Sequence, residues 1–107
     1  MILGRVVGKV VAPQKLASLT GAKLLLVDPL RFDVASGSAG GTQKLVVAVD
    51  TLGTGLGEVV LLVQGSSARL ASPEGKQPID AAIVGIVECV QWHDRLLRHA
   101  DLAGVAT

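Results

Sequence analysis

Short runs of aliphatic residues alternate with turn-forming residues along the whole chain. Strands of half-buried sheets show such runs of Val, Ile and Leu, bounded by Gly, Pro, Asp and Ser. The lengths of the runs favour strands over long helices. The five predicted strands are residues 2–11, 22–27, 44–50 and 58–64, and a fifth segment within residues 79–90.

Proline and small residues mark the segments between these strands. The Ala-Pro and Asp-Pro dipeptides at positions 12–13 and 28–29 predict the ends of the first two strands, because a proline restricts the residue before it. We expect residues 14–20 to form a connection with one helical turn. Residues 33–43, rich in Gly, Ser and Ala, predict a flexible surface loop, and residues 72–78 a polar loop.

Two segments have helical character instead. Residues 65–70 predict a short helix whose free N–H groups Ser66 or Ser67 would cap. Residues 92–103 show helical periodicity, with one apolar face. The residues on that face are Trp92, Leu96, Leu97 and Ala100.

Together these elements predict an all-β fold. The expected architecture is a small five-stranded, OB-like Greek-key barrel, with a short helix between strands four and five and a C-terminal helical tail. We expect residues 1–90 to form a single β-barrel domain and residues 91–107 to form the helical tail.

The composition predicts that copies of the chain associate. Half of the 107 residues are hydrophobic, yet Phe32 and Trp92 are the only aromatic residues. A domain of this size buries only about two-thirds of the surface that its unfolded chain exposes. A spanning helix needs about 18 apolar residues, whereas no apolar run is longer than residues 59–63, and the N-terminus does not resemble a signal peptide. The surplus of apolar surface is therefore expected to pack against other copies.

The charge and the cysteine content argue against several classes of partner and site. The net charge is +1 and no basic block occurs, which argues against nucleic acid as a partner. The single cysteine, Cys89, cannot form an internal disulfide, as is typical of the cytoplasm. Its place near the end of a strand predicts a small buried side chain rather than a reactive thiol. No Cys and His residues have the spacing of metal ligands, so we expect no metal or other cofactor.

The glycines at positions 53, 55 and 57 are the motif of this sequence that is most similar to a nucleotide-binding loop. A dinucleotide-binding loop needs a helix N-terminus directly after its glycines, but residues 58–64 predict a strand. The third glycine also comes one residue early for the G-x-G-x-x-G pattern. We therefore expect a hairpin turn whose glycines take positive φ or allow close backbone approach.

No set of residues predicts catalysis. The segment at positions 65–69 departs from the G-x-S-x-G nucleophile pattern, because Arg69 replaces the last glycine. His93 and His99 are six residues apart and do not share a helix face. We expect Arg69 to pair with a carboxylate instead. The candidate partners are Asp50, Glu58 and Asp80.

An OB-like barrel that binds a small ligand or an oligonucleotide is the alternative function. Barrels that bind single strands combine a basic groove with aromatic platforms. Phe32 follows the second predicted strand and Trp92 lies past the fifth, so the other strands have no aromatic residue. This composition makes oligonucleotide binding the weaker hypothesis.

Several blocks of the sequence, in this order, resemble one known family. Its first strand is similar to residues 1–12, and its central signature is similar to residues 47–61 (VAVDTLGTGLGEVVL). The other similar segments are Lys15 with residues 19–27, residues 65–69 (GSSAR) and residues 78–87 (PIDAAIVGIV). The family is the ethanolamine-utilisation and carboxysome (EutN/CcmL) family of bacterial microcompartment vertex proteins, and the resemblance covers roughly residues 1–90.

The resemblance implies a non-enzymatic barrel that forms homopentamers and caps the corners of a polyhedral shell in the bacterial cytoplasm. It implies hexameric and pseudohexameric shell proteins as partners, and neither nucleic acid nor membrane. It places a glycine loop near the five-fold axis around a narrow pore, where Thr54 replaces the common Ala and would add a hydroxyl to the rim. The implied axis residues are Gly53, Thr54, Gly55, Leu56 and Gly57, and the implied barrel and subunit contacts are Asp50, Glu58, Ser66, Ser67, Arg69 and Asp80.

Overall fold

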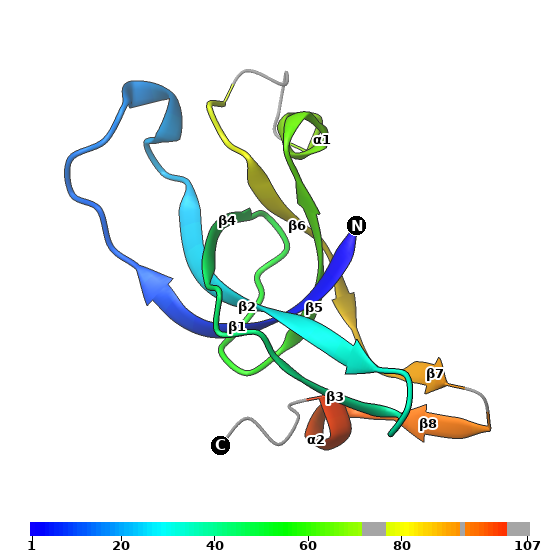
Figure 1. Cartoon of the computed structure of the whole chain (residues 1–107). Coiled ribbons are helices and arrows are strands. Elements are labelled where there is room, and N and C mark those ends of the chain that lie inside the picture. The colour runs from blue at the N-terminus through cyan, green and yellow to red at the C-terminus, as the bar shows by residue number, and fades with distance from the viewer. Residues whose placement is uncertain (72–76, 93, 103–107) are drawn as a thin grey trace.

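The computed structural model describes residues 1–71, 77–92 and 94–102. These residues form a barrel and an arm that projects from it (Figure 1). The arm consists of the end of the second strand from Leu30 onward, residues 38–41, and the described residues from 90 to 102. Residues 72–76 of the expected polar loop, His93, and residues 103–107 of the expected tail lie outside the described residues. The strands are β1 (Ile2–Val10), β2 (Lys23–Asp33), β3 (Ser38–Gly41), β4 (Val46–Asp50), β5 (Val59–Gln64), β6 (Ala81–Val87), β7 (Val90–Trp92) and β8 (Arg95–Leu97). The helical elements are η1 (Ala17–Leu19), α1 (Ser66–Arg69) and α2 (His99–Leu102).

Five strands close the barrel in the order β1-β5-β6-β4-β2, and β1 also pairs with β2. The pairs are antiparallel except for β4 and β6, which run parallel. That parallel pair consists of Val49 with Ala82 and Asp50 with Ile83. The predicted five-stranded barrel is confirmed, as are the short helix between its fourth and fifth strands and the helical turn before its second strand.

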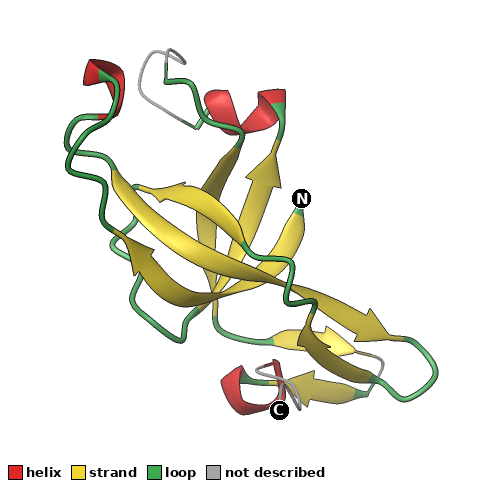
Figure 2. Cartoon of the chain, turned by 60° about the vertical axis from the view of Figure 1, so that its left-hand side comes forward, coloured by secondary structure: helices red, strands yellow, loops and turns green. Residues whose placement is uncertain are grey.

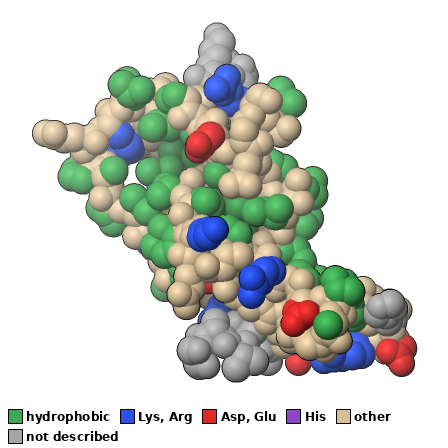
Figure 3. Space-filling model, in the orientation of Figure 1, with side chains coloured by type: hydrophobic (Ala, Val, Ile, Leu, Met, Phe, Trp, Pro, Cys, Tyr) green, Lys and Arg blue, Asp and Glu red, His purple; other side chains and the backbone are tan. Residues whose placement is uncertain are grey.

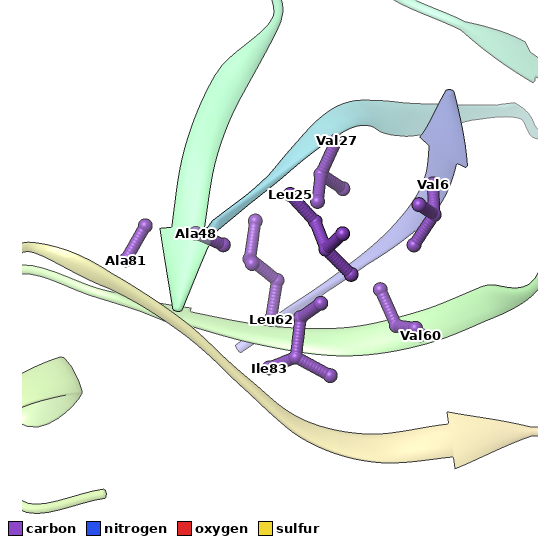
Figure 4. Packing of buried hydrophobic residues seen from close by; sticks show 8 residues of the cluster. All are labelled: Val6, Leu25, Val27, Ala48, Val60, Leu62, Ala81 and Ile83. Atoms are coloured by element: carbon purple, nitrogen blue, oxygen red, sulfur yellow. The ribbon is translucent and has the colours of Figure 1, made fainter. Parts of the chain in front are cut away.

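Aliphatic side chains from all five barrel strands fill the interior, as Figure 4 shows. Because each strand sends alternate residues inward, the β-branched and Leu-rich runs supply this core without aromatic residues. Burying one such side chain contributes roughly 1.5–3 kcal/mol relative to leaving it exposed. The core residues are Val6, Leu25, Val27, Ala48, Val60, Leu62, Ala81 and Ile83.

Strand β2 runs from the barrel into the arm (Figures 1 and 2). Its first part pairs with β1 and β4, and from Leu30 onward it pairs with β3. Pro29 lies opposite Gly4 where these partners change, and a proline, which has no N–H to donate, is tolerated at such a break in the ladder. The predicted end of the second strand at Asp28 and Pro29 is therefore wrong.

Residues 33–43 contain strand β3, so the prediction that this segment is only a flexible loop is wrong. Ala39 is buried in a hydrophobic cluster of the arm. The small residues allow the strand to approach its neighbour closely, since a Cβ on Gly41 would overlap the carboxylate of Asp28. Weak strand propensity predicted a loop here, but the pairing with β2 decides the structure.

The segment after β6 belongs to the arm and forms a β7–β8 hairpin followed by α2. Trp92 stacks on Phe32 with ring centroids 6.0 Å apart, and the Arg95 guanidinium donates from Nη1 to the Gly37 carbonyl at 3.2 Å. Phe32 and Trp92 pack against the hydrophobic cluster that contains Ala39 and also includes the buried Leu97 and Leu102.

The predicted helical tail is confirmed only over His99–Leu102, because Trp92, Leu96 and Leu97 lie on strands. The helical spacing of these residues was real, but contacts with the arm select the hairpin. Periodicity within one segment contains no information about such a partner. None of the helices in the described ranges is long and apolar enough to cross a membrane.

Replacing Gly4 by Ala tests how closely β1 and β2 approach in the barrel. A Cβ on Gly4 would lie 2.5 Å from Val27 Cγ1, so we expect the free energy of unfolding to fall by roughly 1–3 kcal/mol. Gly40→Ala is the matched control, because nothing lies within 4 Å of the added Cβ and the change should stay within about 0.5 kcal/mol. Urea denaturation of both variants at one protein concentration makes the comparison, and equal losses would contradict this packing.

Candidate functional site

The glycine loop, residues 51–57, connects β4 to β5 and contains the predicted axis residues. Gly53 and Gly57 have φ of 80° and 85°, a region that favours glycine, so the expected positive φ is confirmed at these two positions. Gly55 lies outside that region. A Cβ there would lie 3.3 Å from Glu58 Oε1, at the end of a side chain, and would meet no backbone atom of this chain within 4 Å.

Asp50 holds the first part of the glycine loop. Its Oδ1 accepts from the Leu52 N–H at 3.1 Å and from the Thr54 hydroxyl at 2.9 Å, and its Oδ2 accepts from the Thr54 N–H at 2.8 Å. Asp50 and Thr54 are the two buried polar residues among those the structure describes. Burying a charge is costly unless it is paired and hydrogen-bonded, and these three donors meet that condition.

The hydroxyl of Thr54 therefore points to Asp50 rather than to solvent, and Thr54 is only 1% exposed. The expectation that this hydroxyl makes a pore rim more polar finds no support in the monomer. Leu56, in contrast, is 70% exposed on the same loop.

Lys23, at the start of β2, completes this cluster and was missed by the sequence analysis. Its Nζ donates to the Thr54 carbonyl at 2.7 Å and lies 3.4 Å from Asp50 Oδ2. Lys23 stands opposite Asp50 in the β2–β4 register, and opposite charges at such positions attract. Nothing in the sequence gives this register, because it follows from how the barrel closes.

The hydrogen bonds also shift the pKa of Asp50. Burial alone would raise it, but the bonds from Leu52 and from Thr54, together with Lys23, outweigh burial and hold the pKa below its usual value of 3.8. Asp50 is therefore a carboxylate at neutral pH and stabilises the loop in its charged form.

Four backbone N–H groups of the glycine loop, those of Leu52, Thr54, Gly55 and Gly57, have acceptors within the chain. Glu58 Oε1 accepts from the Gly55 N–H at 2.8 Å, and the Val6 carbonyl accepts from the Gly57 N–H at 2.8 Å. A phosphate-binding loop needs free N–H groups and a following helix, whereas strand β5 follows here. The predicted strand after the loop is confirmed, but the predicted hairpin is wrong, because β6 lies between β4 and β5 in the sheet and the two strands do not pair with each other.

The other predicted contact residues lie at the opposite end of β5, around α1. Ser66, Ser67 and Arg69 are on this helix, and the Gly65 N–H just before it donates to the Asp80 carbonyl at 2.8 Å. Gly65 occupies the N-cap with no side-chain cap, so the predicted capping by Ser66 or Ser67 is wrong. The structure thus divides the predicted residues into two groups, one around Asp50 and one around α1.

Two further expectations concern reactive and stacking groups. Cys89 is exposed, so the prediction of a buried side chain is wrong. It lies between β6 and β7, where the chain leaves the barrel.

Phe32 and Trp92 stack on each other in the arm and thus offer no pair of platforms on the barrel for an oligonucleotide. Within the described ranges, no three His, Cys, Asp or Glu residues gather as metal ligands.

Comparison with known proteins identifies relatives of the whole barrel. The model of the family described as "Ethanolamine utilisation protein EutN/carboxysome" matches residues 1–88. The shell vertex protein GrpN of Rhodospirillum rubrum is 46% identical over 97 residues, which cover 85% of this chain and 97% of GrpN. The shell vertex protein PduN of Salmonella typhimurium is 49% identical over 88 residues, covering 82% of this chain and 96% of PduN.

Solved structures agree with these matches. The structure of CcmL from Gloeobacter violaceus superposes with a TM-score of 0.77 at 40% identity and covers 90% of this chain and 94% of CcmL. The GrpN structure, a pentameric microcompartment shell protein, superposes with a TM-score of 0.71 at 41% identity and covers 88% of this chain and all of that one.

Replacing Asp50 by Asn tests the charged anchor of the loop. We expect the free energy of unfolding at pH 7 to fall by roughly 2–3 kcal/mol, because hydrogen bonds to a buried charge are lost. Since the pKa of Asp50 is lower in the folded than in the unfolded chain, the carboxylate stabilises the protein above about pH 4, and this contribution is lost as the pH falls further. The variant should therefore lose less stability than the wild type between pH 7 and pH 3.

Asp33→Asn is the control for this pH series. The pKa of Asp33 is also lowered, first by the hydrogen bond from the Ala35 N–H, but the side chain is exposed, so the effect should be much smaller. Denaturation curves at both pH values make the measurement. A pH dependence of Asp50→Asn equal to that of the wild type would contradict the assigned role.

Proposed function

This chain belongs to the ethanolamine utilisation protein EutN/carboxysome family, and from that membership we propose that it is a vertex protein of a bacterial microcompartment shell. In this role five copies form a ring that caps a corner of the shell in the bacterial cytoplasm. The observation that carries the proposal is the match of vertex proteins along nearly their whole length, including a relative whose structure is a pentamer.

The geometry of a closed shell explains why such a unit is needed. A flat sheet of six-fold tiles has no curvature, so units with five-fold symmetry are required at the corners. A ring of identical chains needs a head-to-tail interface whose rotation closes after five copies. Each chain must then present two different surfaces, one for each neighbour.

The surface of the single chain has apolar area available for such contacts. In Figure 3 hydrophobic side chains gather over the barrel, while charged side chains lie close together at the end of the arm. Apolar area removed from water stabilises association by roughly 25 cal/mol per Å² before the costs of binding. The exposed aliphatic residues on or beside the barrel strands include Val7, Leu45, Val47, Leu52, Leu56, Val84 and Ile86.

The finer roles of individual residues belong to the same proposal. The loop residues Gly53, Thr54, Gly55, Leu56 and Gly57 would lie near the five-fold axis, with Asp50 and Glu58 shaping the loop from within. Ser66, Ser67, Arg69 and Asp80 would shape the other end of the barrel and the subunit contacts. Hexameric and pseudohexameric shell proteins would adjoin the ring, and the protein would act as a structural element without catalytic residues, cofactor, nucleic acid or membrane.

Native mass spectrometry of the purified chain tests the ring directly. Five chains of 10.9 kDa would give a species of about 55 kDa. A dimer, a tetramer or a monomer under gentle conditions would contradict five-fold closure by this chain alone.

Replacing Gly55 by Val tests the placement of the loop at the axis. The branched side chain would crowd the Glu58 carboxylate and the neighbouring copies, so we expect the ring to dissociate while the circular dichroism of the barrel is unchanged. Gly40→Val is the control, because the site of its Cβ is open, and it should leave the ring intact. A normally assembled ring in Gly55→Val would contradict the placement of the loop at the axis.

A further inference from the structure

Three elements meet at the polar cluster of Asp50, Thr54 and Lys23, and each contributes one residue. Asp50 ends β4, Lys23 begins β2, and Thr54 is the middle residue of the glycine loop. All three polar groups of Thr54 are bound: its N–H and hydroxyl by Asp50, and its carbonyl by Lys23. The centre of the loop is therefore fixed to two barrel strands at once.

These contacts restrain a loop that is rich in glycine. Gly53, Gly55 and Gly57 occupy alternate positions in it, and glycine loses more conformational freedom on ordering than any other residue. If the loop became ordered only on contact with a neighbour, this entropy loss would weaken association. A loop that is ordered within one chain avoids the loss at that step.

The main contact of Lys23 is its hydrogen bond to the Thr54 carbonyl, and not its ion pair with Asp50. Its ammonium is 3.4 Å from the Asp50 carboxylate and its side chain is 39% exposed, and such exposed pairs contribute little by themselves. The contact with the Thr54 carbonyl is shorter, at 2.7 Å. The lysine therefore holds the loop backbone, while Asp50 supplies the charge that keeps the lysine in place.

We propose that Lys23, Asp50 and Thr54 are positioning residues that order the glycine loop within each chain before the ring forms, and that they thereby set the strength of the ring. This inference rests on the proposed function, because it takes the loop to lie at the interface of the copies. It assigns a role to Lys23, which was not among the predicted axis or contact residues.

The test compares two substitutions of Thr54. Thr54→Val has nearly the same shape but lacks the hydroxyl, and Thr54→Ser restores it. Hydrogen exchange of the Leu52 and Thr54 amides, both bound to Asp50, reports the order of the loop, with the Val60 and Leu62 amides of β5 as the reference. Native mass spectrometry over a dilution series gives the concentration at which half of the rings dissociate.

For Thr54→Val we expect exchange of the two loop amides to rise by about tenfold and the half-dissociation concentration to rise by several-fold, consistent with the loss of one hydrogen bond. The β5 amides should exchange as in the wild type, and Thr54→Ser should restore both measurements. Lys23→Met is the second variant, since it keeps the aliphatic stem of a partly exposed side chain. Lys9→Met, at an exposed position of β1, is its matched control and should change neither measurement.

Two results would overturn the inference while the wild type still forms a pentamer. One is unchanged exchange of the loop amides in Thr54→Val and Lys23→Met. The other is faster exchange with an unchanged half-dissociation concentration, because the loop would then be ordered for a reason unrelated to the ring. A wild-type chain that forms no pentamer would instead contradict the proposed function.

Discussion

The closure of the barrel by the short parallel pair between β4 and β6 is the constraint on which the rest of the structure depends. Val49 and Asp50 pair with Ala82 and Ile83, and this contact joins the two halves of the sheet. Because β4 ends at Asp50, the closing residue is also the one from which the glycine loop departs. Barrel closure and loop position are thus coupled through one side chain, whose carboxylate accepts hydrogen bonds from Leu52 and Thr54.

The arm has a hydrophobic cluster of its own, although the chain has few large side chains. Its cluster contains both aromatic residues, Phe32 and Trp92, and brings together β2, β3, the β7–β8 hairpin and α2. The barrel, in contrast, is filled by aliphatic residues alone. Small domains bury a limited share of their surface, and aliphatic residues remain exposed on the barrel of the single chain.

Features encoded within one segment could be predicted from the sequence. The aliphatic runs gave the five barrel strands, and the glycines gave positive φ at Gly53 and Gly57. Features that depend on a distant partner could not be predicted in this way. Ser38–Gly41 has weak strand propensity but pairs with β2, and Trp92 pairs with Arg95 on β8 and stacks on the distant Phe32. Lys23 was missed for the same reason, because its contact with Thr54 spans 31 positions of sequence.

Whether five copies close into a ring around the glycine loop can be seen in a cryo-electron microscopy structure of the purified assembly. We expect a closed ring with five-fold symmetry, with residues 53–57 of each copy around the axis and Lys23 bound to Thr54 as in the single chain. A ring of another order, or a five-fold ring with the loop on its outer rim, would contradict it.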